Sequence, residues 1–262
     1  MILNNLSILP FYPITTSDPT PRECDKWWVY GSIYPLFIKR GGAIPVQFTG
    51  VLPSTLNLYK ADGTYMSSQQ PSSIASKTID GTTYFCFSLV VNYQPGRYYF
   101  RTTVSGVTYI SDVITVVWDI TPYLKLEWWD DQDFVMDAGV IIYNNSGGTN
   151  VYKNVLYLAS DLAKPEYIFE EEGENRDGYF FPIKQISEKR YKFRFLAPEY
   201  LLDVMRFIRM SDHIKITYRG QEFYPDTFLM TPTWEDNGDL ANVECEFDTN
   251  TVAKKIGRLI TP

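Results

Sequence analysis

The strongest constraint on the fold is a series of short β-forming segments, each closed by a turn signal, in the first half of the chain. Turn signals stand at Asp62-Gly63, Pro95-Gly96 and Ser105-Gly106. Between them lie segments with strong strand preference, namely Ile44–Thr49, Thr55–Lys60 and Tyr84–Val91. Turn signals at a spacing of ~8–12 residues are typical of β-sandwiches. The first half is therefore predicted to be an all-β module.

The last part of this module carries a more specific signal. The stretch PGRYYFR…VSGVTYISDVITVV resembles the final hairpin of immunoglobulin-like or fibronectin-like modules. The resemblance implies an N-terminal immunoglobulin-like (Ig-like) β-sandwich, which we place in residues 1–118.

A boundary is predicted at Trp118-Asp119-Ile120-Thr121-Pro122, where a β-forming run ends at a proline. The charge balance changes at the same point: residues 1–118 carry a net charge of +2, and residues 119–262 carry −9. The acidity of the chain therefore belongs to the second half, for which we expect a separate β domain over residues 123–262.

Within the second half, the period of the apolar pattern changes once. In Lys189–Leu196, Tyr191, Phe193 and Phe195 alternate with charged residues, which indicates a strand with one wet face. From Pro198 to Met210 the apolar residues recur at helical spacing, with a proline and a glutamate at the start. One amphipathic helix is predicted at about 198–210, among further strands, and the run VMDAGVIIY, residues 135–143, is interpreted as one of these strands. The short basic segment Lys254–Arg258 is interpreted as helical.

A long stretch without clear periodicity, about residues 160–187, separates the early strands of this domain from the alternating strand. It contains EEEGENRDGYFFP, residues 170–182. Long loops of this kind are usually functional or form extended arms. We interpret the stretch as an arm with an acidic, solvated part (Glu170, Glu171, Glu172 and Arg176) and an aromatic docking end (Tyr179, Phe180 and Phe181), because aromatic residues are common interface anchors.

Catalytic signatures are not found. The only histidine is His213, beside Asp212, and no GxSxG motif, catalytic-cysteine signature, P-loop or GxGxxG motif accompanies it. We expect no enzymatic activity, no catalytic residue and no cofactor. A hydrolase with two carboxylates is the least favoured alternative, since no pattern selects a pair.

Metal binding and disulfides are not predicted either. Acidic clusters at Asp130–Asp137 and Glu170–Asp177 lack the EF-hand pattern, so they read as solvated faces, although a surface Ca²⁺ site stays an open alternative. Cys24, Cys86 and Cys245 form no CxxC pair and are predicted to be reduced thiols.

The overall charge and the N-terminus restrict partners and location. A net charge of −7 argues against specific nucleic-acid binding. No apolar run of the ~20 residues that a membrane helix needs is present, and the start MILNNLSILPFYP lacks a basic n-region. We therefore expect synthesis in the cytoplasm and no membrane partner.

Two tryptophan pairs, Trp27-Trp28 and Trp128-Trp129, favour an interface or a sugar-binding platform. Neighbouring residues of a strand point to opposite faces, so one member of each pair is expected in the core and the other at a surface. Subunit contact is the preferred reading, and Trp128 and Trp129 join the candidate assembly residues. Glycan binding is the alternative.

Whole phrases of the second half carry a family resemblance. The stretches EWWDDQDFVMDAG, LAKPEYIFEEEGENRDGYFFPIKQISEKRYKFRFLAPEYLLDVMRFIRMSDHI and FDTNTVAKKIG resemble structural proteins encoded by phages and prophages of gut Bacteroidales, over roughly residues 123–257. The resemblance implies a virion protein of the tail or the head–tail connector. By analogy of fold with tail-tube and tail-adaptor proteins it implies a ring, in which a hairpin or loop reaches the next subunit.

The sequence therefore predicts a mainly β protein with an Ig-like sandwich, a tail-tube-like β domain, an arm and one helix. Its expected role is that of a phage virion structural protein, made in the host cytoplasm, that forms a homo-oligomeric ring with other virion proteins. An acidic inner surface would let DNA slide through without specific binding. A surface glycan-binding or adhesion protein is the alternative function.

Overall fold

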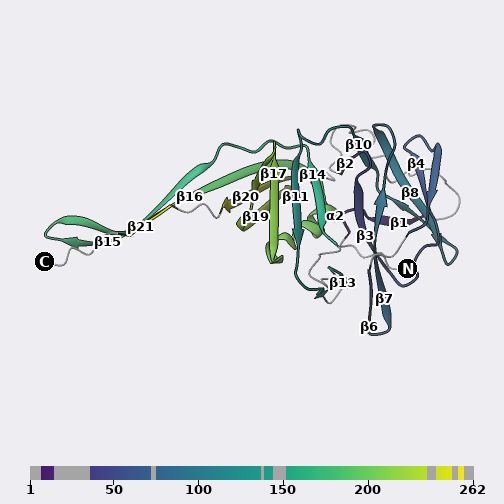
Figure 1. The fold of residues 1–262 in the computed structure, drawn as a ribbon, viewed down its shortest axis with the longest axis horizontal. Coiled ribbons are helices and arrows are strands. Elements are labelled where there is room, and N and C mark those ends of the chain that lie inside the picture. The colour runs from purple at the N-terminus through teal and green to yellow at the C-terminus, as the bar shows by residue number, and fades with distance from the viewer. Residues whose placement is uncertain are drawn as a thin grey trace.

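The structure, a computed structural model, describes residues 7–14, 36–71, 75–136, 139–143, 152–234, 240–249 and 253–256. Within these residues the fold is mainly β, which confirms the predicted class. The helical part consists of α2 (Glu199–Met205) and one turn of 3-10 helix, η1 (Ile208–Met210). Figure 1 shows two packed β modules at one end and a long hairpin that leaves them at the other.

The first half forms two sheets that pack face to face. Its strands are β1 (Phe11–Ile14), β2 (Phe37–Lys39), β3 (Ala43–Thr49), β4 (Leu56–Lys60), β5 (Tyr65–Gln69), β6 (Ala75–Ile79), β7 (Thr82–Val90), β8 (Gly96–Val104), β9 (Val107–Ser111) and β10 (Ile114–Val117). One sheet has the order β3-β7-β6. In the other, β8 lies between β4-β5 and the continuous edge β9–β10, which pairs with β1 and β2. This is an Ig-like arrangement, with β8 as the central strand of the larger sheet.

Aromatic packing and one hydrogen bond define the interior of this sandwich. Phe48 stacks on Phe87 with ring centroids 5.0 Å apart, and Phe11 lies 5.1 Å from Phe48. The hydroxyl of Tyr98, at the start of β8, donates a hydrogen bond of 2.7 Å to the carbonyl oxygen of Gln94. A tyrosine that ties the start of this strand to the preceding turn is the tyrosine corner of Ig-like sandwiches.

The smaller sheet is covered on both sides. Strand β3 is buried without interruption from Ile44 to Phe48, a pattern that requires cover on both faces. One face lies in the sandwich core. The other carries Cys86 and Ala75 and packs against the second half, in a cluster completed by Ile141, Ile142, Tyr143, Tyr152 and Phe207.

Polar contacts cross the same seam between the two halves. The side-chain amide of buried Gln47 donates to the carbonyl oxygen of Ile142 at 3.4 Å, and Lys77 forms an ion pair with Asp133 at 2.8 Å. The connection between the halves runs from Val117, the end of β10, to Leu124, the start of the next strand. The predicted boundary segment lies in this connection, but the two halves share buried contacts rather than standing apart.

The second half is also built from two facing sheets. Its strands are β11 (Leu124–Trp129), β12 (Phe134–Met136), β13 (Gly139–Ile141), β14 (Asn154–Leu158), β15 (Glu166–Arg176), β16 (Tyr179–Pro198), β17 (His213–Tyr218), β18 (Gln221–Phe223), β19 (Pro225–Trp234), β20 (Leu240–Thr249) and β21 (Ala253–Ile256). The sheets have the orders β14-β11-β17-β18 and β15-β16-β20-β19, with β21 on the edge of β16. Phe223 of the first sheet contacts Tyr191 and Phe247 of the second, at 4.9 and 5.7 Å between ring centroids.

The predicted helix is shorter than expected. It begins after Pro198, which is still paired with Leu240 in the sheet, and ends at Met205, after which the chain tightens into η1. Phe207 and Ile208 are buried in this tighter segment, and Met210, which the helical pattern places on the apolar face, is exposed. Tertiary packing therefore overrides the helical propensity at the end of the stretch.

Two other secondary-structure predictions were wrong. The run VMDAGVIIY, interpreted as one strand, forms the hairpin β12–β13, with residues 137–138 outside the described part. The segment Lys254–Arg258, interpreted as helical, overlaps strand β21, which pairs with Lys184–Ser187 of β16. In both cases the partner strand decides the conformation, and a pattern within the segment cannot reveal that partner.

Candidate assembly surface on the arm

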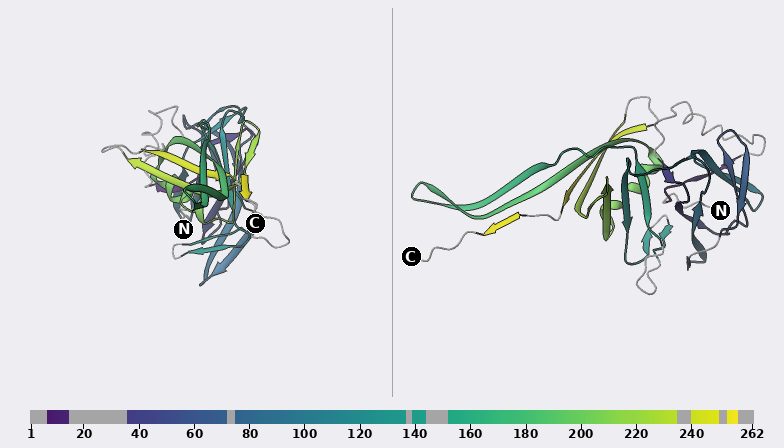
Figure 2. Two further views of the ribbon diagram at one scale, coloured as in Figure 1. Left: turned by 90° about the vertical axis from the view of Figure 1, so that its left-hand side faces the viewer. Right: turned by 45° about the horizontal axis from the view of Figure 1, so that its top comes forward.

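The stretch predicted to be irregular is a long β-hairpin, which we call the arm: Glu166–Arg176 of β15 and Tyr179–Lys189 of β16. Its strands pair from Glu166↔Arg190 to Arg176↔Tyr179. Eleven residues of β15 at a rise of about 3.3 Å give a length of about 35 Å. Figures 1 and 2 show the arm pointing away from both modules, while the rest of β16 runs back into the body. The prediction of an arm agrees with the structure, and the prediction that it lacks regular structure is wrong.

The turn and one irregularity shape the arm. Asp177 and Gly178 form its tip, both with positive φ, 51° and 80°, which is the two-residue turn that Asp-Gly favours in hairpins. The register shifts between Glu172 and Gly173, which leaves Ile183 as an extra residue on β16. Such a bulge bends the strand and increases its twist.

The inner face of the arm continues the core-facing side of β16. In the body this side carries Phe193 and Phe195, both buried. Strand alternation and the observed register put Tyr167, Phe169 and Phe180 on the same side in the arm. There these side chains are 61%, 71% and 50% exposed. The sheet that covers this side in the body does not extend over the arm, as Figure 2 shows, so an aromatic surface is left open.

The outer face of the same sheet is charged and paired with itself. In the body, three successive cross-strand ion pairs join β16 to β20: Arg190–Asp248 at 2.8 Å, Lys192–Glu246 at 3.2 Å, and Arg194–Glu244. In the arm, Lys184 lies 3.6 Å from Glu172. Exposed pairs of this kind contribute little each, and they keep this face wet. The inner face of the arm thus carries three exposed aromatic side chains, with Glu171 and Gln185 among them, and the outer face carries the Lys184–Glu172 pair together with the exposed Tyr179.

The Arg190–Asp248 pair predicts a pH-dependent contribution to stability. Hydrogen bonds from Arg190 lower the pKa of Asp248, so the unfolded chain binds this proton more readily than the folded one. The contribution is therefore present above the unfolded pKa of about 4 and is lost as pH falls through the lower folded value. We expect Asp248→Asn to lower the free energy of unfolding by about 1 kcal/mol at pH 7, since the pair is partly exposed.

Urea unfolding of the wild type and of Asp248→Asn at pH 7 and at about pH 2.5 measures this. The difference between the two proteins should shrink at the lower pH. An equal difference at both pH values would mean that the ion pair is not its source.

The structure brings together most of the predicted assembly residues. Glu170, Glu171, Glu172, Tyr179 and Phe180 are all exposed on the arm. Arg176 and Phe181 take part in its backbone pairing, but their side chains lie outside the described set. The sequence analysis did not identify Tyr167 and Phe169 as assembly residues. In the hairpin they lie opposite Lys189 and Ser187, which share a face of β16 with Tyr191 and Phe193. This pairing is what marks them, and it is visible only in the structure.

The tryptophan pair does not belong to this surface. Trp128 is fully buried in the core, which contradicts its assignment to an interface. Trp129 is half-buried, with the His213 ring stacked at 5.1 Å and the Lys153 ammonium 3.8 Å from its ring centroid. The ring of Trp129 therefore already contacts two side chains of the same protein, His213 and Lys153. Trp27 and Trp28 lie outside the described residues.

The histidine and the two described cysteines, which could have served in catalysis or metal binding, are buried or in contact with their own chain. His213 is the first residue of β17, and its Nε2 lies 2.9 Å from a carboxylate oxygen of Asp131. Cys86 and Cys245 are free, buried thiols, as predicted for these two, and burial raises the pKa of Cys86 to about 12. Among the described residues no group of three metal-binding side chains comes together, and no described helix is long and apolar enough to cross a membrane.

Comparisons with known proteins add little to this picture. No protein-family model matches the chain, and no curated protein does. A chain from the crystal structure of Dpr2 Ig1-Ig2 in complex with DIP-Theta Ig1-Ig3 is similar over 87% of this chain and 96% of its own, at 7% identity and a TM-score of 0.18. A likeness this weak carries no functional argument.

Proposed function

We propose that the protein is a phage virion structural subunit of the tail or the head–tail connector, which assembles with copies of itself into a ring. The observation that carries the proposal is the uncovered inner face of the arm. Exposed apolar side chains that gather on one surface often mark an interaction site, and the projecting hairpin leaves Tyr167 and Phe169 open to solvent near its base and Phe180 near its tip.

Burial of these side chains against a neighbour would supply the binding energy. Burying one large apolar side chain stabilises by about 1.5–3 kcal/mol, before the cost of association is subtracted. We take the neighbour to be a second copy, by analogy of fold with tail-tube and tail-adaptor proteins, which form rings. An arm that leaves one subunit and lies on the next makes a heterologous contact, and repeated contacts of this kind give a ring when the rotation between subunits closes.

The charge distribution agrees with this role. The second half, which carries the arm, holds the whole negative excess of the chain, −9 against +2 in the first half. An acidic lumen would repel the DNA backbone and allow passage without binding. The Ig-like module lies at the opposite end of the molecule from the arm, where it is free to meet other virion proteins (Figure 1).

Mass and shape in solution test the proposal. Light scattering after size exclusion, with negative-stain electron microscopy of the same fractions, should show closed rings of many copies of the 30.3 kDa chain. Assembly should increase with protein concentration, since each contact is between separate chains. A monomer at every concentration reached, with no rings on the grid, would contradict self-assembly.

A further inference from the structure

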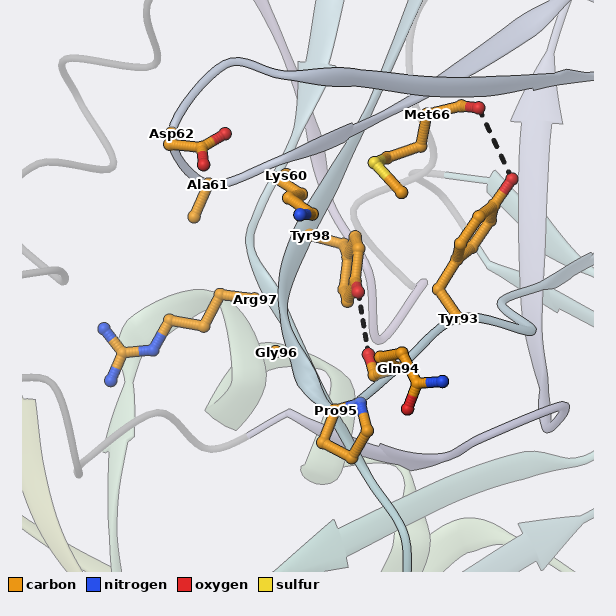
Figure 3. A pocket seen from close by; sticks show the side chains of 10 residues that line it. All are labelled: Lys60, Ala61, Asp62, Met66, Tyr93, Gln94, Pro95, Gly96, Arg97 and Tyr98. Atoms are coloured by element: carbon orange, nitrogen blue, oxygen red, sulfur yellow. Dashed lines mark hydrogen bonds between the residues drawn. The ribbon is translucent and has the colours of Figure 1, made fainter.

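A pocket of about 570 Å³ opens at one end of the Ig-like sandwich, far from the arm. It lies between the β4–β5 turn, residues 60–63, and the turn before β8, residues 93–96. Figure 3 shows Tyr98 in the middle, with Met66 and Tyr93 on one side and Ala61, Asp62 and Arg97 on the other. Pockets for small ligands have volumes of about 300–1,000 Å³, so one sugar residue or a short oligosaccharide fits.

Hydrogen bonds hold both walls in place. Tyr98 donates from its hydroxyl to Gln94, and Tyr93 donates to the carbonyl oxygen of Met66 at 3.5 Å. The backbone N–H of Ala61 donates to Arg97 at 2.9 Å, which ties the β4–β5 turn to β8. A site with pinned walls needs little ordering when a ligand enters, which favours binding.

The lining combines an aromatic wall with charged side chains. The rings of Tyr93 and Tyr98 lie 6.0 Å apart at 34°, beside the half-buried Met66. Lys60 is exposed and Arg97 half-buried, and within the described residues neither forms an ion pair. Hydrogen bonds from Thr64 lower the pKa of Asp62, which keeps this carboxylate ionised as an acceptor. The exposed amide of Gln94 adds a donor and an acceptor.

We infer that this pocket binds a sugar ring that carries a carboxylate, such as a uronic acid residue of a polysaccharide. The apolar face of the ring would lie on Tyr93, its carboxylate would meet Lys60, and its hydroxyls would bond to the side-chain amide of Gln94 beside Tyr93. A purely apolar ligand would bury these charges without partners, and a phosphorylated nucleotide would bring more negative charge against Asp62. The pocket thus supplies the aromatic platform for glycan binding that Trp128 and Trp129 cannot provide.

Calorimetric titration of the full chain with D-glucuronic acid tests the inference. A monosaccharide is expected to bind with a dissociation constant on the order of 1 mM. D-Glucose, which lacks the carboxylate, and sodium acetate, which lacks the ring, should each bind at least about tenfold more weakly. Uridine monophosphate is the probe for a nucleotide site, and its binding as tightly as glucuronic acid would overturn the assignment.

Variants locate the site. Lys60→Met and Tyr93→Leu should each weaken glucuronic acid binding about tenfold, and the exposed Lys39→Met on β2 of the same module should not change it. Lys60 is exposed, so its variant keeps the test valid if Tyr93→Leu does not fold. Equal affinity of Lys60→Met and the wild type would refute the pocket as the site. Ring formation depends on the arm and is measured separately, so either proposal can fail alone.

Discussion

A chain with a shortened arm is expected to remain monomeric under conditions in which the intact protein forms rings. Glu170 and Ile186 face each other in the hairpin, so deleting residues 171–185 and joining these two through Asp-Gly preserves the register. The deletion removes Phe180 and the tip, which lie outside the core. The melting temperature should therefore stay within a few degrees of the wild type, because a change of about 1 kcal/mol moves it by only about 2–4 °C in a chain of this size.

A point variant separates the length of the arm from its chemistry. Phe169→Ser combined with Phe180→Ser keeps the hairpin but removes two exposed aromatic rings, and it should weaken assembly at least about 100-fold. Val51→Ser, an exposed apolar position on the Ig-like module, is the matched control and should assemble normally. Light scattering and electron microscopy give the readout. Rings of normal abundance from both the shortened chain and the Phe169→Ser, Phe180→Ser chain would show that the arm is not an assembly element.

Replacing Phe193 with alanine is expected to lower the free energy of unfolding by about 3–5 kcal/mol. Phe193 is buried where β16 enters the body, with its ring centroid 6.0–6.4 Å from those of Phe195, Phe228 and Phe247. Truncation leaves a cavity between the two sheets of the second half. Domains are stable by only about 5–15 kcal/mol, so the loss is a large share of the total.

The next residue of the strand provides the control. Arg194 points to the outer face, its side chain is 71% exposed, and it pairs with Glu244. Arg194→Ala should cost less than about 1 kcal/mol. Urea unfolding followed by circular dichroism measures both. Similar losses from the two variants would mean that β16 does not separate a dry face from a wet one at this point.

Strands with one buried face could be predicted because apolar residues then recur at every second position of the sequence. Tyr191, Phe193 and Phe195 are the clearest case, and Leu56–Lys60 in the first half follows the same rule. The arm was not predictable in this way, since both of its faces meet solvent and no buried side imposes alternation. Its one local signal is Asp177-Gly178, a strong hairpin turn that stands between strands too polar to be recognised.

The same limit applies to the candidate assembly surface. The aromatic end Tyr179–Phe180 could be identified from composition alone. That Tyr167 and Phe169 lie on the same face as Phe180 depends on the pairing of β15 with β16, including the bulge at Ile183. The assignment of Trp128 failed for a related reason. Alternation shows that one of two neighbouring tryptophans is buried, and only the packing of β11 between β14 and β17 shows which one.

Residues read along the chain were enough to predict the mainly β class, the change of charge after Trp118, the alternating strand around Phe193 and an arm before it. These are local properties, set by side-chain chemistry and by periods of a few residues. Three features emerge only from the folded chain: the two halves share a buried seam, the helix stops at Met205, and the arm is a hairpin that aligns Tyr167, Phe169 and Phe180 on one face. Each of these depends on which distant segments pair and pack, and contacts of that kind leave no period in the sequence.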